Sequence, residues 1–119
     1  MKLLIVDDSS IMRKAIQKYL SSHDLEVVGV AGDGVSALEI FKEKSPDIVT
    51  LDITMPEMDG LTCLEEILKI KADTKVLVIS ALKDESTALE ALKKGARSFL
   101  GKPFTEQSLN EAFSQLLTE

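Results

Sequence analysis

The sequence predicts a three-layer α/β fold, in which helices cover both faces of a five-stranded parallel sheet. Five short apolar runs alternate along the chain with five stretches whose apolar residues recur at helical spacing. The runs are continuously apolar and rich in β-branched residues, which is typical of strands buried on both faces. Right-handed crossovers would join these five βα units into one sheet. With 119 residues, the chain has the length of a single domain.

The first two βα units lie in the N-terminal third of the chain. The first expected strand, residues 3–6, reads Leu-Leu-Ile-Val, and apolar side chains then share one helical face over residues 11–20. The second expected strand, residues 27–30, reads Val-Val-Gly-Val, and residues 35–41 follow at helical spacing. Asp33 stands just before that second helix, where its carboxylate can accept hydrogen bonds from free backbone N–H groups.

The last three units repeat this pattern. Asp84 and Thr105 stand just before the fourth and fifth helices as N-caps. Gly95 follows the fourth helix, where a left-handed backbone is favourable. No linker interrupts the units, so we expect one domain over residues 1–119 without an output domain. Strands are expected at 47–51, 76–79 and 98–100, and the helices that follow them place apolar faces at 61–68, 88–92 and 109–117.

Composition excludes several classes of function. The chain carries 14 basic and 20 acidic side chains, and its net charge is −6. An acidic chain without a basic stretch is not expected to bind nucleic acid or anionic membranes. No apolar segment approaches the roughly 18 residues of a membrane span. The lone Cys63 cannot form an internal disulfide, which favours a reducing, cytoplasmic location.

Polar residues stand at the carboxyl ends of the expected strands. Asp7 and Asp8 follow the first strand, and Asp52 follows the third. Ser80 ends the fourth strand, and Lys102 follows the fifth. Ligands of open parallel sheets bind beyond these ends, where the strand order reverses. For the order 2-1-3-4-5, this point lies between the first and third strands. We therefore expect three carboxylates, a hydroxyl and an ammonium at one rim of the sheet.

The charges indicate what this rim can bind. Two carboxylates about 4 Å apart repel by roughly 4 kcal/mol at an effective dielectric constant near 20. Three carboxylates must therefore take up a proton or bind a cation, and oxygen ligands on a partly open rim favour Mg²⁺. Beside such a cation, an aspartate can act as a nucleophile and hold an acyl phosphate. Lys102 and the Ser80 hydroxyl are suited to bind the phosphoryl oxygens.

Each residue also has a purely structural interpretation. A single aspartate at a strand end is commonly a helix cap or a turn residue, and residues 7–10 could be only a capping segment for the first helix. A Lys-Pro pair is commonly an ordinary loop. The functional interpretation is favoured because all these residues fall on the same predicted rim.

At these residues the sequence resembles the receiver domain of two-component response regulators, most closely the stand-alone chemotaxis type. The resemblance covers essentially the whole chain, in order and with the spacing of the family. It implies a flavodoxin-like (βα)₅ three-layer sandwich with the strand order 2-1-3-4-5. The matching segments are residues 4–8, 46–61, 78–81, 95–96 and 99–104.

The resemblance implies a phosphoacceptor and a metal site. Asp52 corresponds to the phosphoacceptor, which takes a phosphoryl group from the phosphohistidine of a sensor histidine kinase. Asp8 and Asp52 correspond to Mg²⁺ ligands, and Asp7 to a residue that binds the ion through water. The backbone carbonyl of Thr54 would complete the coordination by the protein.

The resemblance also implies a switch. Ser80 corresponds to the hydroxyl that moves to the phosphoryl group, and Lys102 to the cation that pairs with it. The bond from Lys102 to Pro103 is often cis in the family, and an X–Pro bond tolerates that isomer. Phe99 corresponds to an aromatic ring that turns inward with the hydroxyl, and many chemotaxis members carry tyrosine there. The structural alternative for Phe99 is a strand residue packed in the core.

These implications lead to a phosphorylation-controlled signalling switch that catalyses only its own phosphorylation and dephosphorylation. A separate target protein would bind the face formed by the fourth helix, the fifth strand and the fifth helix. A phosphatase is a further possible partner, and we expect a monomer in the unphosphorylated state. Chemotaxis is the expected pathway. The alternative is a non-chemotactic single-domain regulator or a phosphorelay intermediate.

Three other classes fit less well. Haloacid-dehalogenase-like phosphatases require a second aspartate two residues after the nucleophile, where this chain has Thr54, and a cap insert. A flavin-binding electron carrier would need a phosphate loop rich in hydroxyls and amides after the first strand, but Asp7 and Asp8 stand there. A degenerate receiver that serves only as a docking module would not be expected to retain Asp52, Ser80 and Lys102 together.

Three further features are given structural interpretations. His23 lies in a polar turn without an evident partner and is expected to be exposed to solvent. Cys63 lies within the third helix and is expected to pack in the core. Residues 69–71 read Lys-Ile-Lys and are expected to form a solvated helix end.

Overall fold

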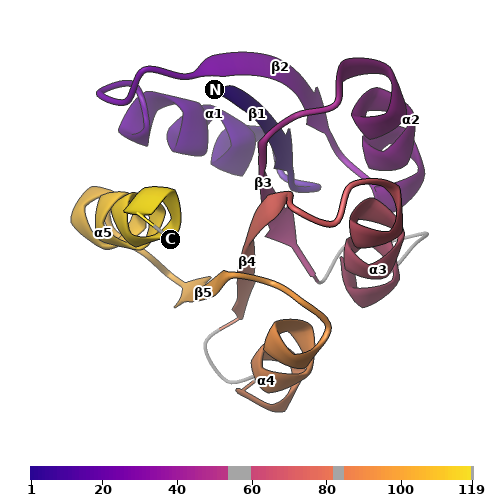
Figure 1. Ribbon diagram of the computed structural model, residues 1–119. Coiled ribbons are helices and arrows are strands. Elements are labelled where there is room, and N and C mark those ends of the chain that lie inside the picture. The colour runs from indigo at the N-terminus through magenta and orange to yellow at the C-terminus, as the bar shows by residue number, and fades with distance from the viewer. Residues whose placement is uncertain (54–59, 82–84, 119) are drawn as a thin grey trace.

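The computed structural model describes residues 1–53, 60–81 and 85–118, and it confirms the predicted α/β fold (Figure 1). Five parallel strands form one sheet in the order β2-β1-β3-β4-β5, as the resemblance implied. The strands are β1 (Lys2–Val6), β2 (Glu26–Ala31), β3 (Ile48–Asp52), β4 (Lys75–Ala81) and β5 (Ser98–Lys102). The helices are α1 (Ser10–Tyr19), α2 (Gly34–Lys44), α3 (Gly60–Ile70), α4 (Glu85–Lys93) and α5 (Glu106–Thr118).

Alternate side chains of the strands point to opposite faces, so the sheet has a core on each side. Leu4 and Val6 of β1 pack in one core, which α2, α3 and α4 cover. Leu3 and Ile5 pack in the other core, which α1 and α5 cover (Figure 1). Cys63 is fully buried in the first core, as predicted. Burial on both faces explains why β1, β3 and β4 read as continuous apolar runs. The expectation was wrong for β2 and β5, which form the edges of the sheet: β5 is half-buried throughout, and Val27 and Val30 of β2 are exposed.

The helix termini confirm most of the capping predictions. The Asp33 carboxylate accepts a hydrogen bond from the backbone N–H of Ser36 at 2.7 Å, and the Thr105 hydroxyl accepts one from Ser108 at 3.0 Å. Gly95 has a φ of 113°, which a residue with a Cβ rarely adopts. The predicted cap Asp84 lies outside the described residues. Within the described ranges, none of the helices is long and apolar enough to cross a membrane.

The strands extend slightly beyond their predicted ends. The third strand, predicted at 47–51, runs over Ile48–Asp52, because Asp52 pairs with Ile79 of β4. The fifth strand continues through Lys102, which pairs with Ala81. In the sequence, a polar side chain ends an apolar run and so suggests the end of the strand. In the structure, the polar residue still belongs to the strand, because strand pairing uses only backbone N–H and C=O groups. The sheet therefore carries Asp52 and Lys102 directly at its rim.

Candidate functional site

The strand order brings the predicted site residues to one end of the sheet. β1 lies between β2 and β3, and Asp7 and Asp8 directly follow it. Asp52 is the last residue of β3, which is hydrogen-bonded to β1 on one side and to β4 on the other. Lys102 is the last residue of β5. Because all strands are parallel, their carboxyl ends meet at the same rim.

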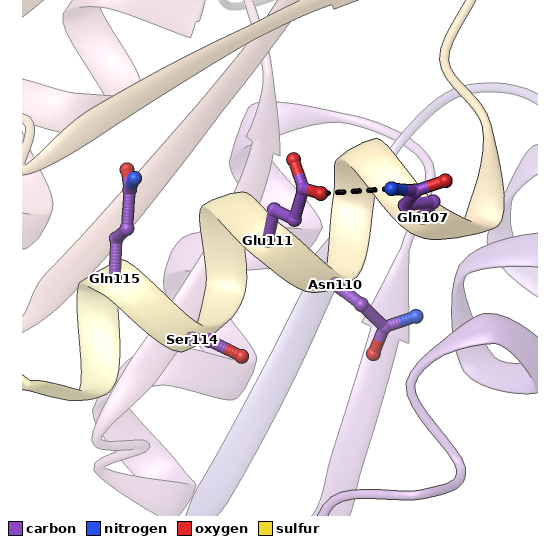
Figure 2. A pocket seen from close by; sticks show the side chains of 5 residues that line it. All are labelled: Gln107, Asn110, Glu111, Ser114 and Gln115. Carbon is purple, nitrogen blue, oxygen red and sulfur yellow. Dashed lines mark hydrogen bonds between the residues drawn. The ribbon is translucent and has the colours of Figure 1, made fainter.

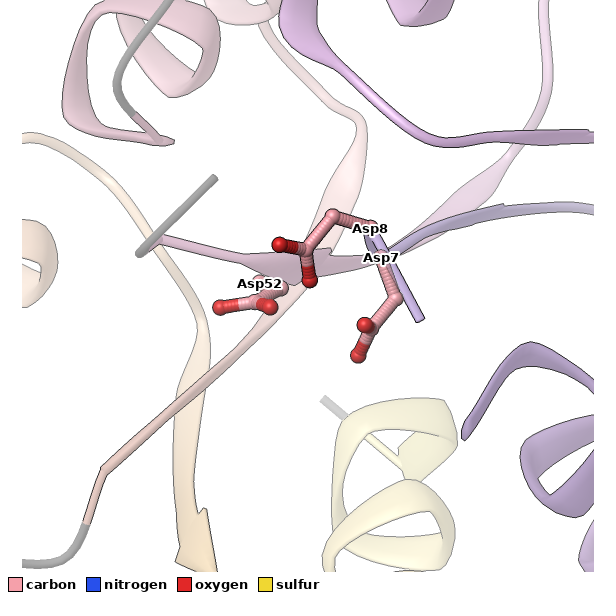
Figure 3. A group of neighbouring side chains, drawn as sticks. All are labelled: Asp7, Asp8 and Asp52. Carbon is pink, nitrogen blue, oxygen red and sulfur yellow. The ribbon is translucent and has the colours of Figure 1, made fainter. Parts of the chain in front are cut away.

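The three aspartates form a cluster (Figure 3). Asp7, Asp8 and Asp52 each offer one carboxylate oxygen, and these oxygens all lie within 4.8 Å of one another. Asp7 is 0% exposed and Asp52 is 2% exposed, whereas Asp8 is exposed. In Figure 3 the carboxylates of Asp8 and Asp52 face one another across the ends of β1 and β3. The cluster therefore has a buried floor and one side that solvent can reach.

The Lys102 ammonium bridges the two buried carboxylates. Its Nζ atom lies 3.1 Å from Asp7 Oδ2 and 3.3 Å from Asp52 Oδ2. Burial opposes the charge of Lys102, but attraction to Asp52 and Asp7 outweighs it, so the pKa of Lys102 is raised above its ordinary value. Lys102 therefore stays cationic at neutral pH. The bond from Lys102 to Pro103 is cis, the isomer that the resemblance allowed.

Asp7 is held at every polar group. Its N–H donates to the Ala31 carbonyl at 2.9 Å, and its Oδ1 accepts from the Ser9 N–H at 2.9 Å. Its carbonyl oxygen accepts from the Arg13 guanidinium at 2.6 Å. Burial raises the pKa of Asp7 above its ordinary range, although the Ser9 N–H and the Lys102 ammonium act in the opposite direction. The charged form of this buried carboxylate is unfavourable unless a cation lies close to it, and the Lys102 ammonium is such a cation.

Asp8 differs from its neighbour. Its side chain is exposed, and within the described ranges no hydrogen bond or ion pair engages its carboxylate. Among the described residues, the Lys102 ammonium pairs with Asp7 and Asp52 but not with Asp8. Carboxylate oxygens in such a cluster, open on one side, are the donor set that Mg²⁺ prefers. The residues present therefore fit a magnesium ion.

Part of the capping interpretation is also correct. Ser9 is the N-cap of α1, and its hydroxyl accepts from the Met12 N–H at 3.2 Å. Asp7 orders this cap through its bond to the Ser9 N–H. Residues 7–10 thus start the first helix and also carry two of the clustered carboxylates.

Ser80 and Phe99 lie on the two strands beside the cluster. Ser80 of β4 is fully buried and follows Ile79, which pairs with Asp52. Phe99 of β5 is half-buried and packs against the core under α4. With Ala88, Leu89 and Leu92 of α4, it lines a pocket of about 240 Å³. Phe99 therefore serves as both core residue and surface residue. The predicted carbonyl ligand Thr54 lies outside the described residues.

Sequence reasoning was wrong about His23. Its side chain is half-buried, its Nε2 lies 2.7 Å from Asn110 Oδ1, and its ring centroid lies 5.0 Å from that of Phe113. Asn110 in turn donates its amide to the carbonyls of Tyr19 and Glu106, both at 2.9 Å. Because its partner is 87 residues away, no local pattern could reveal it.

Sequence reasoning also missed Arg13. This arginine lies in the first turn of α1, four residues after the N-cap Ser9. That spacing could have suggested that its side chain extends back to the loop that carries Asp7 and Asp8.

A second depression, of about 440 Å³, lies on the polar side of α5 (Figure 2). All its lining residues come from this one helix, and Gln107 donates to Glu111 at 3.0 Å. Side chains from one helix do not converge on a common point, so this depression is ordinary helix surface. Its lining residues are Gln107, Asn110, Glu111, Ser114 and Gln115.

Comparison with known proteins agrees with this geometry. The chemotaxis protein CheY of Bacillus subtilis is 44% identical over 116 residues, which cover 98% of this chain and 97% of that protein. CheY of Thermotoga maritima is 42% identical over 115 residues, which cover 97% of this chain and 96% of that protein.

Solved structures show the same fold. A chain in the crystal structure of the CheX–CheY–BeF₃–Mg²⁺ complex from Borrelia burgdorferi superposes with a TM-score of 0.94 at 36% identity, covering 100% of this chain and 90% of that one. Residues 3–114 match the family model of the response regulator receiver domain. The chain described here therefore belongs to the response regulator receiver domain family.

Proposed function

We propose that this chain is a chemotaxis-type phosphorylation switch, in which Asp52 accepts a phosphoryl group from a sensor histidine kinase. The observation that carries the proposal is the cluster of Asp7, Asp8 and Asp52, with Lys102 bridging two of its members. The CheY relatives support the chemotactic assignment. Such a receiver acts in the cytoplasm, where the kinase presents its phosphohistidine.

In the proposed step, a carboxylate oxygen of Asp52 attacks the phosphorus atom of the phosphohistidine. The new O–P bond forms as the P–N bond breaks, and the imidazole leaves with its electron pair. Lys102 lies within 3.3 Å of Asp52 and can neutralise the charge that gathers on the phosphoryl oxygens. Asp7 orients that ammonium from its other side. A magnesium ion held by Asp8 and Asp52, and by Asp7 through water, would supply the remaining positive charge.

We propose that the output passes through Ser80 and Phe99. Once Asp52 is phosphorylated, Ser80 turns its hydroxyl toward the phosphoryl oxygens, and Phe99 moves inward into the space that this opens. Leu89 and Leu92 of α4 support a docking role for the face formed by α4, β5 and α5, since they are 59% and 41% exposed beside Phe99. A target protein would bind there. The similar chain from Borrelia burgdorferi is a CheY in complex with CheX, which supports a phosphatase as an additional partner.

The acceptor is tested by intact mass. The purified protein is incubated with Mg²⁺ and acetyl phosphate, and its mass is measured with and without EDTA. We expect a gain of one phosphoryl group that needs Mg²⁺ and disappears in Asp52→Asn. Asp73→Asn serves as the matched control, because Asp73 is an exposed aspartate in the loop before β4. An adduct that persists in Asp52→Asn would refute the assignment of the acceptor.

A further inference from the structure

The acidic rim is braced by a residue outside the phosphorylation machinery described above. The Arg13 guanidinium extends from α1 to the turn after β1 and donates from Nη1 to the Asp7 carbonyl at 2.6 Å. This carbonyl belongs to the peptide group that joins Asp7 to Asp8. The orientation of that peptide sets the direction in which both aspartate side chains leave the backbone.

Arg13 matters most for Asp8. Asp7 is also held by the Ala31 carbonyl, the Ser9 N–H and the Lys102 ammonium. The Asp8 carboxylate, in contrast, has no hydrogen bond or ion pair within the described ranges. Its position therefore depends on the backbone that carries it, and the bond from Arg13 fixes the peptide just before it.

The absence of a side chain at Gly32 leaves space for this guanidinium. A Cβ atom added to Gly32, in the turn between β2 and α2, would lie 3.3 Å from Arg13 Nη1 and 4.0 Å from the Asp7 carbonyl oxygen. That approach is tighter than most Cβ contacts, so a side chain at Gly32 would press on the hydrogen-bonded group. Arg13 is half-buried between the two turns, and no carboxylate of the described residues forms an ion pair with it.

We infer that Arg13 is a positioning residue for the cation site, which orients the Asp7–Asp8 peptide so that Asp8 meets Asp52 at the distance a metal ion needs. The inference rests on the proposed function, because it deepens the magnesium site of that proposal. The proposed role of Arg13 is to orient the two carboxylates, which is different from a purely electrostatic effect of its charge. If Arg13 acted only as a nearby positive charge, its removal would strengthen the binding of a divalent cation. If Arg13 orients the carboxylates, its removal weakens binding.

Calorimetric titration of the metal-free protein with Mg²⁺ distinguishes these signs. We expect Arg13→Gln to lower the Mg²⁺ affinity by about ten-fold, as for other residues that orient metal ligands. Arg13→Lys, which keeps the charge and one donor, should restore part of the loss. Lys14→Gln removes a charge from the neighbouring, exposed position and should leave the affinity unchanged or slightly higher. Affinity in Arg13→Gln equal to or above that of the wild type would overturn the inference.

Gly32→Ala provides an independent test. It should lower the Mg²⁺ affinity about two- to three-fold in the wild-type background and have no further effect in Arg13→Gln, because the crowded group is then gone. Equal effects in both backgrounds would contradict the inference. If Arg13→Gln fails to fold by circular dichroism, Arg13→Lys and Gly32→Ala carry the test, and both must weaken binding.

A readout without metal separates this inference from the proposed function. In EDTA, amide hydrogen exchange at Asp8 and Ser9 should be faster in Arg13→Gln than in the wild type and unchanged in Lys14→Gln. If the wild type fails to bind Mg²⁺, the proposed function falls, while faster exchange in Arg13→Gln would still support the brace. If the wild type binds Mg²⁺ and the exchange rates are equal, only the inference falls.

Discussion

At the scale of single residues, Asp7 combines structural roles with a place in the proposed metal site. It caps no helix itself, but it orders the N-cap Ser9, extends the pairing of β1 with β2 and holds Lys102. Its carboxylate is fully buried beside another carboxylate, which is unfavourable for folding. Sites of this kind lower the stability of a domain in exchange for binding or chemistry.

The substitution Asp7→Asn tests this cost. Because burial raises the pKa of Asp7 in the folded state, the folded protein holds the proton more tightly than the unfolded chain does. The stability linked to that proton is present at low pH and is lost as the pH rises through the folded pKa. In EDTA at pH 7 we expect Asp7→Asn to raise the free energy of unfolding by about 1–2 kcal/mol.

The gain should shrink as the pH falls, because the wild-type carboxyl then becomes neutral as well. Urea unfolding of both proteins from pH 7 to pH 4 measures it. A variant less stable than the wild type at pH 7 would show that the pair with Lys102 outweighs the burial of charge.

At the scale of elements, α1 and α5 are tied by polar contacts as well as by their shared core. Asn110 of α5 donates to the Tyr19 carbonyl at the end of α1 and accepts from His23 in the following turn. Because both amide hydrogens of Asn110 face carbonyl oxygens, its Oδ1 faces the imidazole, and His23 Nε2 is the donor. Edge-to-face contact between Tyr19 and Phe104, with centroids 6.5 Å apart, adds to this connection. Phe104 lies two residues after Lys102, so α1 also supports the end of β5.

Replacing Asn110 tests the connection between α1 and α5. Asn110→Ala leaves the Tyr19 carbonyl and the His23 ring without their partner, and we expect it to lower the free energy of unfolding by about 1–3 kcal/mol. Glu111→Ala, at the neighbouring exposed position, should change it by less than about 0.5 kcal/mol. Urea unfolding at pH 7 compares the two variants. A loss in Asn110→Ala no larger than that in Glu111→Ala would mean that packing alone holds α5 against α1.

At the scale of the whole molecule, the topology creates the site. The chain passes from β1 to the edge strand β2 and back to β3, so that Asp7 and Asp8 meet Asp52 although more than forty residues separate the pair from it. Two cores hold the sheet from both sides and leave the polar rim at its end. The three carboxylates at this rim repel one another, so a cation that binds there should raise the stability of the whole fold.

Magnesium should therefore stabilise the folded domain. At a concentration ten times the dissociation constant, binding to the folded state alone adds about 1.4 kcal/mol to the free energy of unfolding. For a domain of this size we expect the melting temperature to rise by about 3–7 °C. Asp8→Asn should reduce the shift, while Asp73→Asn should retain it. Thermal unfolding with MgCl₂, against NaCl of equal ionic strength, checks this. Equal shifts in both salts would indicate screening of charge rather than binding.

The sequence by itself determined the ten elements and the residues at the rim. Each strand is a short apolar run in the sequence, which allowed the strands to be recognised, although only β1, β3 and β4 are buried on both faces. A parallel sheet brings together the residues at the carboxyl ends of its strands, so Asp52 and Lys102 could be predicted to meet. The resemblance in residues 4–8, 46–61, 78–81, 95–96 and 99–104 added the strand order and the proposed roles.

Only the tertiary structure decided the contacts between distant residues. It set Lys102 between Asp7 and Asp52, joined His23 to Asn110 and laid Arg13 across the Asp7 carbonyl beside Gly32. The periodicity of apolar residues shows which face of a helix or strand is apolar, but it does not show which residue the polar end of a long side chain contacts. A hydrogen bond requires its two atoms to approach within about 3 Å, and that is settled by the packing of whole elements against one another.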